Sequence, residues 1–189
     1  VDVEGMEAAG GTWAILANAY EQYREALIQN YRCDFAHLQE HFLEFLGTSH
    51  AHNFLHGDAA QEHPGLRYVL VDEYQDTNPI QEAIYLTLAQ DEPHNLGVVG
   101  DDDQALYRFR GGTVECMVTF AQACSQAWGA SVQGVQPIPL VENFRSHPQI
   151  VTWCDNFISS SPLKSHSRAH SPGKPSLAAS SSIEGDYPS

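Results

Sequence analysis

Apolar positions in the first quarter of the chain repeat with the spacing of helices. Over 12–31 they recur every three or four positions, as on a helix with one buried face. A second pattern of this kind runs from Phe35 to Leu46, and Asp34 stands directly before it, where its carboxylate can act as an N-cap. The segment 47–65 is rich in Gly, His and small polar residues, so it predicts a loop.

From residue 68 onward, short apolar runs alternate with helical patterns. A continuous apolar run between polar residues is typical of a strand buried on both faces. Strands are expected at 68–71, 96–99 and 138–141, and helices at 78–90, at 114–128 and after a cap at Ser146, with Pro148 in the first turn. The predicted helix caps are Thr77, Thr113 and Ser146. This alternation predicts an α/β fold, a parallel sheet flanked by helices.

The third predicted strand has the weakest pattern of the three. Pro137 and Pro139 stand in or beside it, and proline cannot donate a hydrogen bond to a neighbouring strand. We nevertheless expect 138–141 to join the sheet, because an apolar run leads there into a polar cluster like those after the first two strands.

Composition and charge restrict the possible partners. The 189 residues include 24 Asp and Glu but 9 Lys and Arg, a formal net charge of −15, so binding of nucleic acid by the whole surface is disfavoured. The 4 cysteines form no CxxC pair, which indicates a reduced, cytoplasmic protein. No apolar run reaches the about eighteen residues that a membrane-spanning helix needs, so no membrane segment is expected.

Acidic and polar residues follow each predicted strand. Asp72 and Glu73 come directly after the first, Asp101 begins a polar cluster after the second, and Glu142 after the third. Ligands of open α/β sheets bind beyond the carboxyl ends of strands, so these clusters are expected to meet at one crevice. One of two adjacent carboxylates can hold Mg²⁺ while the next orients or deprotonates water, which suits phosphoryl transfer. The alternative is an acidic pair that only caps the following helix.

The cluster after the third predicted strand contains groups that suit a nucleotide. Arg145 can stabilise negative charge that develops on a γ-phosphate, and Phe144 can stack on a purine base. A surface ion pair between Arg145 and Glu142 is the alternative for the arginine.

A short basic and aromatic segment suits single-stranded nucleic acid. Tyr107 and Phe109 alternate with Arg108 and Arg110, the only basic cluster in an acidic chain. Bases stack on aromatic side chains with about 1–3 kcal/mol each, and guanidinium groups bind phosphates. The alternative is that Tyr107 and Phe109 belong to the core.

Three stretches, taken together and in this order, resemble motifs II, III and IV of superfamily 1 helicases of the UvrD/Rep/PcrA type. They are VDEYQDTNPIQ (71–81), VGDDDQALYRFRGG (99–112) and LVENFRSHPQIV (140–151). The earlier CDFAHLQEHFLEFL is similar to the segment that precedes motif II. The resemblance implies a partial RecA-like P-loop NTPase motor domain. It also implies an ATP-dependent DNA helicase, which couples Mg·ATP hydrolysis to 3′→5′ movement on single-stranded DNA.

The resemblance implies roles in the nucleotide site. Asp72 would hold Mg²⁺, Glu73 would be the catalytic base on water, and Gln104 would sense the γ-phosphate of ATP. Phe144 would stack on adenine, and Arg145 would contact the γ-phosphate.

It also implies roles outside the reacting groups. Gln75 and Asp76 would complete the DExxQD pattern and help to organise the site. Tyr107 and Phe109 would stack on bases of single-stranded DNA, and Arg110 would belong to the same DNA-facing segment.

A phosphate-binding GxxxxGK[ST] loop does not occur in the chain, so the P-loop strand of the motor is expected to be missing. In the family it precedes motif II, and a second motor domain follows motif IV. We therefore expect a fragment that is inactive by itself. Its expected partners are the P-loop segment and the second motor domain of the helicase. The expected first domain, 1–158, is a partial helicase ATP-binding domain with a helical part over 12–46 and an α/β part over 66–158. Residues 159–189 are expected to form a Ser/Pro/His-rich linker or the truncated start of the next segment.

Two other functions fit parts of the pattern. A metal-dependent phosphohydrolase or nuclease could use Asp72, Glu73 and Asp101–Asp103 around two metal ions. It gives no role to Arg145 or to the Tyr107–Arg110 segment. A degenerate motor retained as a binding or regulatory module is the other alternative.

Overall fold

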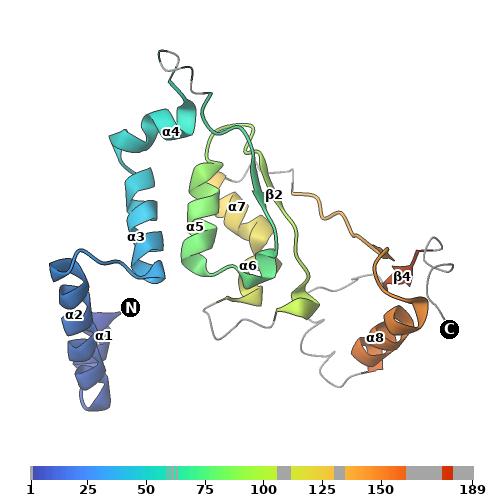
Figure 1. Ribbon diagram of the computed structural model, residues 1–189, viewed down its shortest axis with the longest axis horizontal. Helices are drawn as coiled ribbons and strands as arrows, with labels where there is room; N and C mark the ends of the chain where they lie inside the picture. Colours follow the sequence, from blue (N-terminus) through green and yellow to red (C-terminus); the bar gives the residue numbers. More distant parts are fainter. Residues whose placement is uncertain are drawn as a thin grey trace. The chain divides into compact units, whose positions relative to one another are not determined.

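The computed structural model describes residues 2–58, 60, 62, 64–105, 112–129, 135–160 and 176–180. The chain divides into two units, Val1–Gly65 and Leu66–Ser189 (Figure 1). The first unit is helical, and the second contains helices and short parallel strands.

The first unit confirms both predicted helices and corrects the predicted loop. Its helices are α1 (Val3–Ala9), α2 (Thr12–Gln29), α3 (Phe35–Leu46), η1 (Ser49–Ala51) and α4 (His52–His56). The prediction of a loop over 47–65 is therefore wrong for the part that forms η1 and α4. Ala51 and Leu55 are buried there, and their packing outweighs the polar composition of the segment.

The junction of α2 and α3 is built around the predicted cap residue. Asp34 Oδ1 accepts a hydrogen bond from the backbone N–H of His37, at 2.8 Å, while Oδ2 accepts one from the Tyr23 hydroxyl, at 2.6 Å. The His37 Nδ1 atom also lies 2.8 Å from Asp34 Oδ1. The backbone bond from His37, followed by the hydroxyl bond, lowers the pKa of Asp34 to about 2. One carboxylate thus ties the two helices together.

The apolar face of α2 is less buried than its periodicity predicts. Ala17 is buried, whereas Trp13, Leu16 and Tyr23 are exposed. The other helices of the unit cover only part of this face. The apolar period therefore predicts the helix correctly but not how much of its apolar face is buried.

The second unit contains the first two predicted strands. Strands β1 (Val69–Val71) and β2 (Leu96–Val98) are parallel neighbours, with Val69 opposite Leu96 and Val71 opposite Val98. The expected burial on both faces is wrong for β1, because the Leu70 side chain is 84% exposed. The strands were predicted correctly because a short apolar run marks a strand whether or not a layer covers each face.

Helix α5 (Pro79–Leu88) connects these strands and begins one residue later than predicted. Its cap is Asn78, whose side chain accepts from the Gln81 backbone N–H while the Gln81 side chain accepts from the Asn78 N–H. The predicted cap, Thr77, is instead extended and buried, and its carbonyl accepts from the Thr113 N–H at 3.0 Å. The reciprocal pairing of Asn78 and Gln81 satisfies two N–H groups, so it fixes the helix start.

The predicted 114–128 helix is divided at Thr119 into α6 (Val114–Val118) and α7 (Phe120–Trp128). Thr113 caps α6 as predicted, through its hydroxyl and the Glu115 N–H. At the far end of α7, the Trp128 indole N–H donates to the Leu86 carbonyl at 3.1 Å, which joins α7 to α5.

The prediction of a third strand over 138–141 is wrong. A two-residue strand, β3 (Glu142–Asn143), follows that segment instead. It pairs with β4 (Ala178–Ala179) and not with β1 or β2. Prolines before β3 remove backbone donors, so a longer ladder is not available. The fold is therefore α/β, and the part of the chain that the structure describes contains two separate parallel pairs of strands. That it is a partial RecA-like motor without its P-loop strand stays a prediction.

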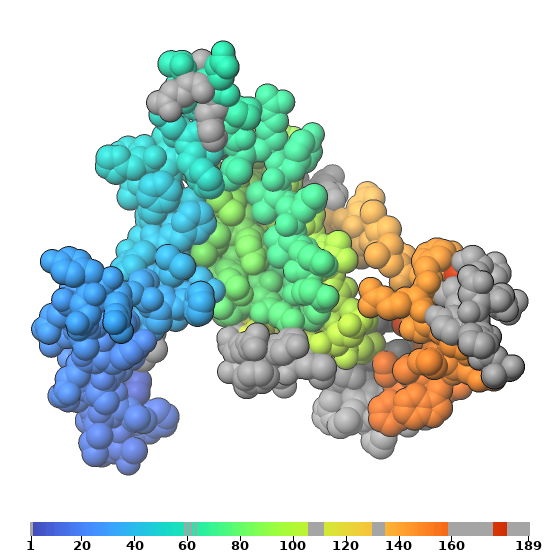
Figure 2. Space-filling model, viewed as in Figure 1, coloured from blue at the N-terminus to red at the C-terminus, as the bar shows by residue number. Residues whose placement is uncertain are grey.

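Helix α8 (Pro148–Ser160) begins one residue later than a cap at Ser146 predicts. It buries few of its apolar side chains. Val151 is buried, whereas Ile150, Cys154 and Phe157 are exposed. The helix lies at the surface on the face shown in Figure 2, where it is orange.

The core of the second unit centres on Tyr74, which is 0% exposed. Its ring packs edge-on against that of Phe120, with 5.2 Å between the ring centroids, and its hydroxyl donates a hydrogen bond to Glu82 Oε1 at 3.0 Å. Burial, together with the nearby Glu82 carboxylate, raises the pKa of Tyr74 and that of the Cys116 thiol, the latter to about 11.

Candidate functional site

The acidic pair begins directly after β1. Asp72 and Glu73 are both exposed, and Asp72 Oδ1 accepts from the Glu73 backbone N–H at 3.0 Å. Glu73 has a left-handed backbone, with φ of 51° and ψ of 43°. This conformation costs about 1 kcal/mol or more for a residue with a side chain, and such residues are frequent at functional sites. It turns the chain from β1 into the short helix η3 (Tyr74–Asp76).

Gln75 connects this turn to the end of β2. Its side chain is only 3% exposed. The amide Nε2 donates to Glu73 Oε2 at 2.6 Å, and the amide Oε1 accepts from the Asp101 backbone N–H at 3.0 Å. Both polar ends of one buried side chain are therefore used, and the bond to Asp101 joins two residues that lie 26 positions apart in sequence.

The loop after β2 is ordered by Asp101. Its Oδ1 accepts from the Asp103 N–H at 3.1 Å, which caps η4 (Asp102–Gln104), and its Oδ2 accepts from Gln104 Nε2 at 2.7 Å. Gly100 is required before it, since a Cβ atom there would lie 2.6 Å from Gln75 Oε1. A continuous hydrogen-bonded series, which we call the relay, thus runs through Glu73, Gln75, Asp101 and Gln104.

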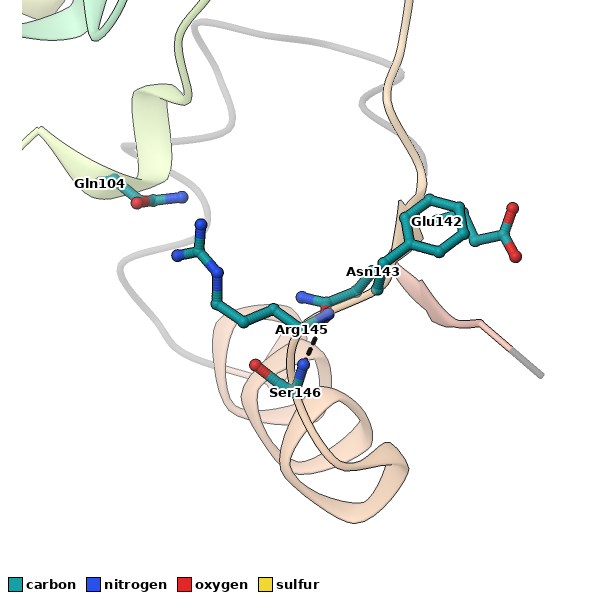
Figure 3. A pocket seen from close by; sticks show the side chains of 6 residues that line it. Gln104, Glu142, Asn143, Arg145 and Ser146 are labelled. Atoms are coloured by element: carbon teal, nitrogen blue, oxygen red, sulfur yellow. Dashed lines mark hydrogen bonds between the residues drawn. The ribbon is translucent and has the colours of Figure 1, made fainter. Parts of the chain in front are cut away.

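The relay ends at an open pocket. The pocket has a volume of about 760 Å³ and is lined by Gln104, Glu142, Asn143, Phe144, Arg145 and Ser146. In Figure 3 the Arg145 guanidinium extends toward the Gln104 side chain, while the Glu142 carboxylate points away from the guanidinium. This orientation does not favour the alternative of a Glu142–Arg145 ion pair.

Asn143 shapes the turn that presents the arginine. Its Oδ1 accepts from the backbone N–H of Arg145 at 2.9 Å and from that of Ser146 at 2.8 Å. The Ser146 bond is drawn in Figure 3. Sequence reasoning gave Asn143 no such role. The signal was available, because asparagine commonly accepts from the backbone two or three residues onward in a turn.

The structure thus brings several of the predicted residues together. Glu73 and Gln104 are members of the relay, and Gln104 shares the pocket with Phe144 and Arg145. Asp72 is bonded to the Glu73 backbone. The three predicted DNA-binding residues lie outside the described residues: Tyr107, Phe109 and Arg110.

The acidic loop offers one group of possible metal ligands among the described residues. One oxygen from each of Asp101, Asp102 and Asp103 lies within 4.8 Å of the others. Both Asp101 oxygens accept hydrogen bonds within the loop, so this carboxylate has a structural role in the relay. Asp101–Asp103 are among the residues that the nuclease alternative would place around two metal ions, and that alternative stays a hypothesis.

Comparison with known proteins places the chain in a family. Residues 3–125 match the model of the UvrD/REP helicase N-terminal domain. The match covers more than half of the chain, and therefore the chain belongs to this helicase family. None of the described helices combines the length and apolar character needed to cross a membrane.

Curated relatives agree with this assignment. The chain is 36% identical to DNA helicase II of Salmonella typhimurium over 143 residues, which are 75% of this chain and 17% of the relative. It is 40% identical to the putative ATP-dependent DNA helicase YjcD of Bacillus subtilis over 88 residues, 47% of this chain and 10% of the relative. It is 37% identical to the ATP-dependent DNA helicase Rep of Salmonella typhimurium over 98 residues, 51% of this chain and 13% of the relative. The matched regions are thus a small part of these proteins.

Proposed function

We propose that the chain is part of an ATP-dependent DNA helicase, in which hydrolysis of Mg·ATP drives 3′→5′ movement along single-stranded DNA. The observation that carries this proposal is the relay, because it joins an exposed carboxylate to the wall of a pocket that also contains an arginine. The family assignment supports the same conclusion. The polarity of movement comes from the family resemblance alone.

The side chains fit the hydrolysis of a nucleoside triphosphate. Glu73 would accept a proton from water as the water oxygen attacks the γ-phosphorus, and the bond to the β–γ bridging oxygen would break to release ADP. Arg145 would neutralise charge on the γ-phosphoryl oxygens, and Phe144 would stack on adenine. Gln104, held by Asp101, would contact the γ-phosphate from the same pocket.

A magnesium ion fits the donor set beside these groups. Asp72 supplies an exposed carboxylate at the end of β1, and Mg²⁺ prefers oxygen ligands of this kind. When bound, the ion would reduce the negative charge of the phosphates. Asp72 would hold it, and the bond from the Glu73 N–H to Asp72 Oδ1 would limit the orientations of that carboxylate.

Single-stranded DNA is the proposed polymer substrate. Tyr107, Phe109 and Arg110 follow Gln104 by three to six residues, so they would receive a signal from the pocket over a short length of chain. The other proposed partners are the remainder of the helicase, namely a P-loop segment and a second motor domain. The small share of each relative that the chain covers supports them.

The proposal is tested by Glu73→Gln in the longest natural polypeptide that contains this chain. We expect single-strand-stimulated ATP hydrolysis to fall by about a hundredfold or more, because the base is lost while shape is kept, with DNA affinity within about twofold of wild type. Glu115→Gln, a change of an exposed carboxylate on α6, is the matched control and should leave both unchanged. Full ATPase activity in Glu73→Gln would contradict the proposal, and DNA cleavage with Mg²⁺ but without ATP would favour the nuclease alternative.

A further inference from the structure

Gln75 is the buried member of the relay, and it does not line the pocket. We propose that Gln75 is a positioning residue that holds the Glu73 carboxylate and the 100–104 loop in one fixed relation, so that a ligand contact at Gln104 changes the orientation of Glu73. This inference rests on the proposed function for its effect on hydrolysis, and on the geometry alone for the bridge itself.

The chemistry at the two ends of the bridge requires one donor and one acceptor. The Glu73 carboxylate can only accept hydrogen bonds, and the Asp101 backbone N–H can only donate one. A side chain between them must therefore donate at one end and accept at the other. Glutamine does both, whereas glutamate would place two acceptors against Glu73 and methionine would offer neither group.

The surroundings of Gln75 fix the amide in this orientation. The side chain is almost completely buried, so water cannot replace a lost partner. Gly100 lies so close that even a methyl group there would collide with Oε1. Glu73, by contrast, is exposed, so the amide of Gln75 is the described contact that restricts its carboxylate.

Asp101 carries the connection from Gln75 to the pocket. Its backbone N–H binds Gln75, and its carboxylate binds the Gln104 side chain. A ligand that draws Gln104 away from Asp101 would break the bond at the Gln104 end of the relay. The bonds from Asp101 to Gln75 and from Gln75 to Glu73 would then be weakened. Hydrogen bonds of this kind change together because they share one residue.

Amide hydrogen exchange at Asp101, followed by NMR in the 189-residue chain, measures the bridge without any ATPase assay. We expect about tenfold faster exchange in Gln75→Met, which offers no acceptor, and faster exchange also in Gln75→Glu, because two carboxylates would repel each other. The double variant Glu73→Gln/Gln75→Glu exchanges donor and acceptor, so it should restore protection to within about threefold of wild type. Gln90→Met, at an exposed position, is the control.

Unchanged exchange in Gln75→Met, or no recovery in the double variant, would overturn the bridge. Where wild-type ATPase is measurable, Gln75→Met should lower kcat by about tenfold or more and leave the KM for ATP within about twofold, and the double variant should stay inactive. Wild-type kcat in Gln75→Met would overturn the positioning role. Absence of ATPase activity in the longest natural polypeptide that contains this chain would instead contradict the proposed function, and the exchange rates would still decide whether the bridge exists.

Discussion

The buried hydroxyl of Tyr74 supports the turn that carries the acidic pair, and Tyr74→Phe tests this support. The substitution removes one atom group and leaves Glu82 Oε1 without the donor that lies 3.0 Å away. The ring itself keeps its contact with Phe120. The backbone N–H of Tyr74 also donates to the Val99 carbonyl at 2.9 Å, so a shift of the residue would disturb both strand ends.

The expected loss follows from the type of bond. A hydrogen bond to a charged group contributes about 1.5–3 kcal/mol, and Tyr74 is fully buried, so water cannot substitute for the hydroxyl. We therefore expect the free energy of unfolding to fall by about 2 kcal/mol. With a urea dependence of about 2 kcal/mol per M, the midpoint of unfolding should fall by about 1 M.

Urea unfolding followed by circular dichroism is the assay. Tyr68→Phe removes a hydroxyl at an exposed position and should change stability by less than about 0.5 kcal/mol. In Tyr74→Phe/Glu82→Met both partners are apolar, so the loss should be smaller than the sum of the two single losses by about 1 kcal/mol. A Tyr74→Phe midpoint equal to that of Tyr68→Phe would refute the reasoning.

Two further predictions concern titration and thiol reactivity. The pKa of Asp34 falls from 3.8 to about 2 on folding, so its carboxylate stabilises the fold above pH 4, and this contribution is lost as the pH falls toward 2. The difference in unfolding free energy between wild type and Asp34→Asn should therefore shrink over that range. A constant difference would argue against the cap. Burial raises the pKa values of the Cys116 and Cys124 thiols to about 11. At pH 8, before denaturation, only the exposed Cys33 and Cys154 should therefore react quickly with a thiol reagent. Fast reaction of all four cysteines would contradict the burial.

The sequence by itself determined the local elements and the family. The period of apolar residues identified α2 and α3, Asp34 identified the start of α3, and two apolar runs identified β1 and β2. These signals suffice because a helix and its cap involve groups within about four positions of each other. The motif residues likewise pointed to the helicase family before any geometry was known.

Tertiary structure decided what depends on distant partners. The carbonyl of Thr77, the residue predicted to cap α5, instead accepts a hydrogen bond from Thr113 in another part of the chain. Strand β3 pairs with β4 rather than with the first pair of strands. A local pattern shows that a segment can form a strand, but the choice of partner depends on which backbone groups meet after the chain closes.

The same division applies to the candidate site. The sequence supplied the residue types after each strand, and their roles in hydrolysis and DNA binding stay predictions. Only the fold showed that Gln75 is buried and that both ends of its amide form hydrogen bonds. These contacts were beyond the sequence because the direction of a hydrogen bond depends on the positions of two groups in space, and here one pair lies 26 residues apart along the chain.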